Sequence, residues 1–139
     1  MNSFHKVIFG FAITISSFYA VAQDKGSVPD LIKQGVQLND QKDFAGAIDK
    51  YSQALKLDPE NVQANYEMAF TLLGSGKGND GVPFVEKAIK ESQSTLFIAS
   101  CYDLLGSIYD QDKQSVKAIE AYKKGIEVNP KYQRLHYNL

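Results

Sequence analysis

The sequence repeats itself at a fixed spacing, and this feature constrains its fold more than any other. Five residues reappear 71 positions later with the same or a similarly small side chain: Gly35 as Gly106, Ala47 as Ala118, Tyr51 as Tyr122, Ala54 as Gly125 and Pro59 as Pro130. Self-similarity at a fixed period marks proteins built by stacking one small unit. Each such unit buries its apolar face only against its neighbours, so we expect one coupled array.

A weaker copy lies between these two and divides the offset unequally. Ala54 corresponds to Ala88, which lies 34 residues later, and Ala88 corresponds to Gly125 after a further 37 residues. The unit is therefore 34 residues long, with three extra residues before the third copy, within the stretch 91–95.

Apolar residues within each unit follow the spacing of amphipathic helices. Ser27 and Asp30 fit a capping box at the start of the first helix. Phe44 opens the second helix after a polar turn and is expected to lie in the core. The third unit predicts helices over 96–110 and 115–128, and no strand-like segment occurs in the sequence.

The third copy resembles a known repeat family through residues at defined positions, namely Tyr102, Leu105, Gly106, Tyr109, Ala118, Tyr122 and Pro130. This pattern is similar to the signature of the tetratricopeptide repeat (TPR). The first copy matches from Gly35 onward but departs from the signature at Leu31, Gln34 and Leu38. The second copy is more degenerate, since it has Asn65, Gly81 and Val85 at signature positions and lacks the closing proline.

The resemblance implies an all-α fold, a TPR-like α-solenoid of three helix-turn-helix repeats in a right-handed superhelical stack. The expected boundaries are TPR 1 at 28–61, TPR 2 with its three-residue insertion at 62–98, TPR 3 at 99–132 and the start of a fourth repeat helix at 133–139. Ile119, Ile126 and Val128 near that end are expected to lack full cover. We therefore expect either a longer natural protein or self-association through the C-terminal end.

Composition and charge exclude several classes of function. The formal net charge is −1 and the charges are scattered, so no basic patch predicts a nucleic-acid partner. His136 is the one histidine after the first 22 residues, and no paired cysteines occur. No nucleophile stands beside a base. We therefore predict no catalytic residue, no metal site, no small-molecule cofactor and no enzymatic activity.

A glycine run resembles a nucleotide-binding motif only in its spacing. Gly76, Gly78 and Gly81 match the dinucleotide pattern, but that chemistry requires a preceding strand and a βαβ unit. An amphipathic helix precedes the run here, so we interpret it as a turn between helices, with Asp80 capping the helix that follows. Cys101, the single cysteine, cannot form an intramolecular disulfide and is expected to be buried.

The N-terminal stretch has the three regions of a secretory signal peptide. Lys6 precedes an apolar run over 7–15, and Ala20 and Ala22 form a small-residue cleavage site before Gln23. An uncleaved anchor would need about 20 apolar residues, and the run is shorter and interrupted. We predict a signal peptide at 1–22, a lead-in at 23–27 and export to the periplasm, the cell envelope or the medium.

The resemblance also implies a concave groove lined by the first helix of each repeat. The groove positions expected to contact a partner are Ile32, Val36, Tyr66, Phe70, Leu73, Asp103 and Asp110, apolar at one end and acidic at the other. One TPR subgroup clamps a peptide carboxylate with lysine, asparagine and arginine. The matching positions here hold Ile32, Val36, Glu67, Ser100 and Leu104, so that activity is not expected.

These features predict an exported interaction module or scaffold that binds a protein or peptide partner in its groove. Two alternatives remain open. The chain could be an accessory TPR segment of a larger envelope enzyme or sensor, or a self-assembling structural protein. The apolar groove positions could also be covered as part of the core.

Overall fold

The structure is a computed structural model that describes residues 26–138, and the predicted signal peptide lies outside these residues. Within them the chain forms helices and no strands. The helices are α1 (Val28–Asp40), α2 (Phe44–Leu57), α3 (Val62–Gly74), α4 (Gly78–Glu91), α5 (Thr95–Gln111), α6 (Ser115–Val128) and α7 (Gln133–Tyr137). None of the helices in this part of the chain is long and apolar enough to cross a membrane.

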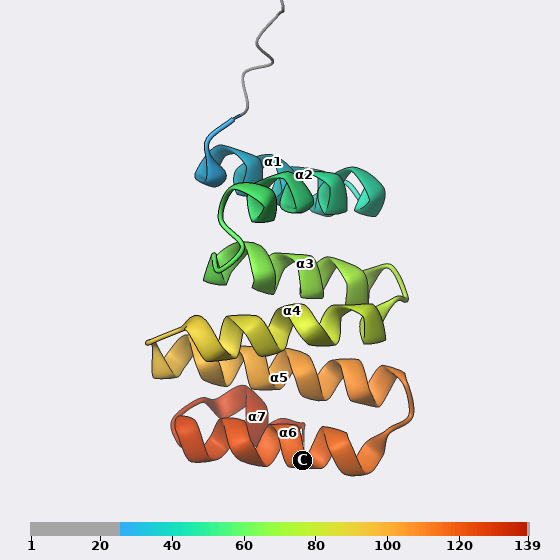
Figure 1. The fold of residues 1–139 in the computed structure, drawn as a ribbon. Helices are drawn as coiled ribbons and strands as arrows, with labels where there is room; N and C mark the ends of the chain where they lie inside the picture. The colour runs from blue at the N-terminus through green and yellow to red at the C-terminus, as the bar shows by residue number, and fades with distance from the viewer. Residues whose placement is uncertain (1–25, 139) are drawn as a thin grey trace, which may run out of the picture.

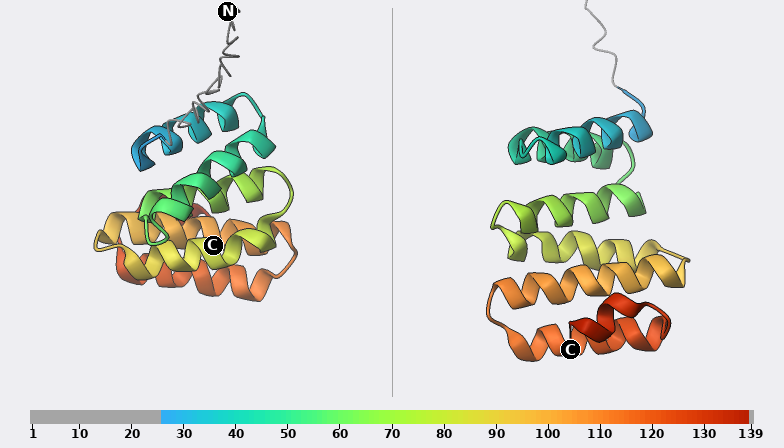
Figure 2. Two further views of the ribbon diagram at one scale, coloured as in Figure 1. Left: turned by 45° about the horizontal axis from the view of Figure 1, so that its top comes forward. Right: turned by 180° about the vertical axis from the view of Figure 1, so that it is seen from behind.

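The helices pair in chain order and the pairs stack along one direction (Figures 1 and 2). α1 packs on α2, α3 on α4 and α5 on α6, and each pair contacts the next, while α7 packs against α6. The all-α arrangement of three helix-turn-helix units, followed by a further short helix, confirms the fold class expected from the repeats. The extra residues of the middle unit fall at the end of α4 and in its connection to α5.

One tyrosine from the second helix fills the space inside the first and third repeats. Tyr51 is fully buried and its ring lies on Gly35 of α1. Tyr122 is 3% exposed and lies on Gly106 of α5 in the same way. A glycine is required at both places because a side chain there would occupy the volume of the tyrosine ring.

Side-chain caps explain where several helices begin. Ser27 Oγ accepts a hydrogen bond from the backbone N–H of Asp30, as the predicted capping box requires, and Asp43 Oδ1 accepts one from the N–H of Gly46. Each such bond satisfies a backbone donor that has no partner within the first turn.

The start of α4 differs from the expectation. α4 begins at Gly78, and Asp80 lies in its first turn instead of capping it. Gly78 fits at this start because it packs against Gln111, Leu73 and Ile108, where a Cβ would have little room. The turn itself is Ser75–Lys77, in which Gly76 has a φ of +78° that favours glycine.

Phe44 is half-buried, so its expected place in the core was wrong. Its ring faces Gly74 at the end of α3, and the Lys42 ammonium lies 6.0 Å from the ring centroid. Phe44 is the first residue of α2, and the core clusters of the described chain do not include it.

Candidate functional site

The first helices of the three repeats form a continuous surface. α1 contacts α3, and α3 contacts α5, although each is separated from the next by an intervening helix in the sequence. This surface, called here the groove face, is the one that the repeat resemblance predicts to bind a partner.

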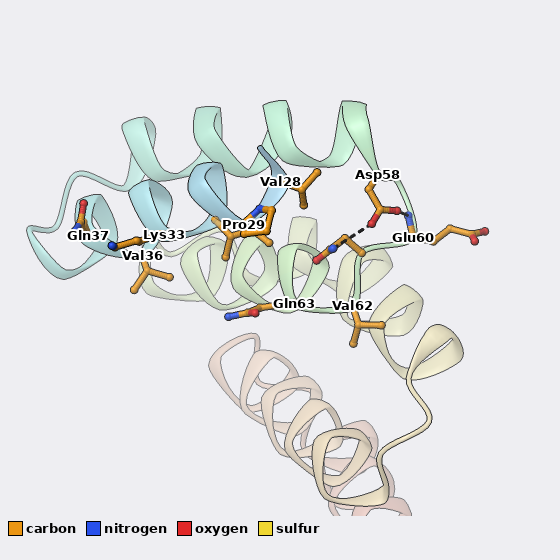
Figure 3. A pocket seen from close by; sticks show the side chains of 11 residues that line it. Val28, Pro29, Lys33, Val36, Gln37, Asp58, Glu60, Val62 and Gln63 are labelled. Atoms are coloured by element: carbon orange, nitrogen blue, oxygen red, sulfur yellow. Dashed lines mark hydrogen bonds between the residues drawn. The ribbon is translucent and has the colours of Figure 1, made fainter. Parts of the chain in front are cut away.

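A hollow of about 760 Å³ opens on this face where α1 meets the start of α3. Figure 3 shows side chains from α1, from the α2–α3 connection and from α3 around it. Its apolar lining includes Val28, Ile32, Val36 and Val62. An apolar side chain of a partner could therefore be accommodated here.

Three aromatic rings lie together where α3 meets α5. The Tyr66 and Phe70 ring centroids are 6.4 Å apart with the planes 9° from parallel. The Tyr66 and Phe97 centroids are 5.2 Å apart with the planes tilted by 58°. Phe70 is 44% exposed, whereas burial raises the pKa of the Tyr66 hydroxyl to about 12. These three residues are called the aromatic cluster below.

The apolar residues predicted for the groove are not equally open. Ile32 is 7% exposed and belongs to the core between the first two repeats, although it also lines the hollow. Val36, Tyr66 and Leu73 are half-buried, and Phe70 is exposed. Phe70 therefore offers a partner the largest open apolar side chain of the predicted set.

The predicted acidic residues already have partners within the chain. Asp103 is 3% exposed, and its Oδ2 lies 2.8 Å from Arg134 Nε of α7. Its Oδ1 accepts a hydrogen bond of 2.6 Å from Asn138 Nδ2. Asp110 accepts a 2.7 Å hydrogen bond from the Tyr122 hydroxyl. A ligand cation could reach Asp103 only by displacing Arg134, and the role of both residues in binding stays a prediction.

Burial raises the pKa of the Asp103 carboxyl, and the Arg134 guanidinium and the Asn138 amide oppose that shift. These two contacts link the C-terminal segment of the described chain to Asp103 of α5. Leu135 of α7 is fully buried, and it occupies the space that Gly125 leaves open on α6.

The groove face also carries an acidic pair that sequence reasoning did not identify as a binding feature. Glu67 of α3 is half-buried, and burial, followed by repulsion from Asp40 at the end of α1, raises the pKa of its carboxyl. Neither carboxylate forms an ion pair within residues 26–138. The available signal was that Glu67 occupies one of the positions matched to the lysine, asparagine and arginine residues of the carboxylate-clamp subgroup.

Cys101 is fully buried, as expected. Burial raises the pKa of its thiol to about 12, which makes the reactive thiolate scarce at neutral pH. In the described part of the chain no group of histidine, cysteine or acidic side chains is arranged to hold a metal ion.

Comparisons with known proteins agree with this geometry. Residues 35–76 match the family described as "TPR repeat", and residues 99–132 match "Tetratricopeptide repeat". A curated relative, the small glutamine-rich tetratricopeptide repeat-containing protein 2 of Mycosarcoma maydis, is 27% identical over 119 residues, covering 84% of this chain and 32% of the relative. Subunit 12 of the mouse (Mus musculus) trafficking protein particle complex is 29% identical over 118 residues, covering 80% and 15%. The chain thus spans a third or less of these relatives.

Solved structures show the same fold. The crystal structure of MamA has a TM-score of 0.73 at 27% identity, over 83% of this chain and 66% of MamA. The first TPR of Spaghetti (RPAP3), solved with the HSP90 peptide SRMEEVD, has a TM-score of 0.73 at 19% identity, over 84% and 90%. The N-terminal domain of stress-induced protein-1 from C. elegans has a TM-score of 0.73 at 20% identity, over 80% and 91%.

Stacked helix pairs with a tyrosine seated on a glycine in the first and third pairs define an α-helical repeat solenoid. The matched segments identify the repeat, and the described part of the chain is a TPR domain. Domains of this kind typically serve protein–protein interaction and peptide binding and are generally not catalytic.

Proposed function

We propose that the chain is a protein-interaction module whose groove face binds an extended or helical segment of a partner protein. The observation that carries the proposal is the open Phe70 ring within the aromatic cluster, where the second repeat meets the third, while the hollow lies where the first repeat meets the second. Large aromatic side chains in a concave surface supply much of the binding free energy in protein interfaces.

Selection from a displayed library of short random peptides, carried out on the immobilised full chain, tests this proposal. The selected peptides should lose at least about 2 kcal/mol of binding free energy when Phe70 is truncated to alanine. Val116→Ala is the matched control, because Val116 is 73% exposed but lies on α6, away from the groove face. Phe70→Ala should leave the thermal unfolding temperature nearly unchanged. Equal losses of peptide affinity in Phe70→Ala and Val116→Ala would contradict binding at the groove face.

Self-association through the C-terminal end is a second candidate function. Val116 and Ile119 on α6 are 73% and 42% exposed and form an open apolar surface. Light scattering of the purified chain over a range of concentrations tests this candidate. Any increase in molecular mass with concentration should be abolished by Ile119→Lys.

A third candidate is an accessory segment of a larger envelope enzyme or sensor, and it is supported by the small share of its relatives that this chain spans.

Export is part of the proposed function and rests on the sequence of residues 1–22. N-terminal sequencing of the chain recovered from the cell envelope or medium should find Gln23 as the first residue. Recovery of the chain with Lys6 and the following apolar run intact, in the membrane fraction, would support an anchor instead.

A further inference from the structure

The acidic pair of Glu67 and Asp40 on the groove face has no ion-pair partner within residues 26–138, unlike Asp103, another acidic position of that face. Asp103 on α5 is paired with Arg134, and Asp110 accepts the hydroxyl of Tyr122. Glu67 and Asp40 have no ion pair among residues 26–138, although Glu67 is half-buried. Placing two carboxylates together at a partly desolvated site is unfavourable unless a positive charge joins them.

A buried hydroxyl beside this pair also lacks a partner. Tyr51 is fully buried, and its hydroxyl has no hydrogen bond within the described part of the chain. The equivalent Tyr122 donates to Asp110, but the position equivalent to Asp110 is Asn39, whose Oδ1 accepts the Thr71 hydroxyl at 3.0 Å.

The charge of the acidic pair acts on this buried hydroxyl. Burial, and then the charge of Glu67, raise the pKa of the Tyr51 hydroxyl; the neighbouring Thr71 hydroxyl opposes this rise, and the charge of Asp40 adds to it. Buried polar groups in native proteins nearly always have a partner, and each exception needs an explanation. A ligand cation bound near Glu67 would reduce the negative charge that acts on this buried hydroxyl.

The acidic pair is continuous with the hollow. Gln63 lines the hollow and lies one helical turn before Glu67 on α3. Its side chain reaches the Glu67 carboxyl, where it opposes the rise in pKa. Lys33 lines the hollow together with Asp58 and Glu60, and Glu60 is already paired with Lys87 at 3.4 Å. An apolar hollow thus ends in a region of negative charge.

We infer that the groove formed by α1 and α3 binds a segment in which a lysine or arginine lies next to an apolar residue. The cation pairs with Glu67 and Asp40, and the apolar side chain enters the hollow beside Ile32 and Val36. This inference rests on the proposed function, because it names the chemistry of the segment bound at the groove face. Arg134 on Asp103 is an internal example of the same pairing between an arginine and a carboxylate of this face.

The displayed-library selection tests this inference directly. Peptides selected on the full chain should be enriched in lysine or arginine beside a large apolar residue. A selected peptide should bind the Glu67→Gln variant about tenfold or more weakly than the unmodified chain, because a charge-assisted hydrogen bond is removed. Asp40→Asn should weaken the same peptide, whereas the control Glu120→Gln, an exposed acid on α6, should not.

The outcomes separate the two proposals. Peptides that depend on Phe70 but carry no basic residue, and that bind Glu67→Gln as tightly as the unmodified chain, would overturn the inference and leave the proposed function intact. A selection that yields no peptide dependent on Phe70 would overturn both. Circular dichroism of each variant checks that the fold is kept, and a loss of affinity in a folded Glu67→Gln variant supports the inference.

Discussion

The substitution Gly106→Ala, which adds one methyl group, tests the contact between Gly106 and Tyr122 in the third repeat. A Cβ at this position would lie 2.5 Å from Tyr122 Cδ1 and 2.6 Å from Cζ, distances that real Cβ atoms do not show. The tyrosine cannot move away because it is 3% exposed and its hydroxyl is bonded to Asp110. Helix propensity alone predicts that Gly106→Ala stabilises the protein by roughly 0.5–1 kcal/mol.

The steric conflict should outweigh that gain. Overpacking a core costs roughly 1–3 kcal/mol, so we expect Gly106→Ala to lower the free energy of unfolding in urea titrations. Gly74→Ala is the control, since its Cβ would lie 3.4 Å from the nearest atom, the Cε1 of Phe44. It should be neutral or slightly stabilising. A Gly106→Ala variant as stable as the Gly74→Ala variant would refute the packing argument.

Three further predictions concern single side chains. Glu67→Gln should stabilise the protein at about pH 7 and lose this advantage near pH 4. Burial and the charge of Asp40 raise the folded-state pKa of Glu67, so ionisation of its carboxyl destabilises the fold as pH rises. Urea titrations at both pH values measure the difference in the free energy of unfolding. Cys101 should resist a thiol reagent until urea unfolds the protein, since its pKa is raised to about 12, and rapid labelling without urea would contradict its burial. Leu135→Ala should cost roughly 2 kcal/mol by emptying the space at Gly125, measured by thermal unfolding, whereas no loss would mean that α7 is not docked there.

The fold could be predicted because its determinants are local and repeated. The offset that links Gly35 with Gly106 and Tyr51 with Tyr122 specifies the same helix–helix contact twice. The start of α4 was missed because Asp80 has the chemistry of a cap, while the actual start depends on how Gly78 packs against α5, a contact between residues far apart in sequence.

The groove residues could be predicted only as positions. The spacing that placed Asp103 on the groove face could not show that Arg134 of α7 already neutralises it. The importance of Glu67 depends on Asp40, which belongs to another repeat, and on the buried Tyr51 hydroxyl, which has no hydrogen bond where the third repeat pairs Tyr122 with Asp110. Such features combine several helices, and no single stretch of sequence contains them.

Binding at the groove face is tested most directly by mapping, with nuclear magnetic resonance, where a selected peptide contacts the chain. The isotopically labelled full chain is titrated with a peptide that carries a basic residue beside an apolar one. The largest shift changes should fall on α1 and α3, at Val36, Glu67 and Phe70. Changes concentrated on α2, α4 or α6, with these three residues unaffected, would contradict binding at the groove face.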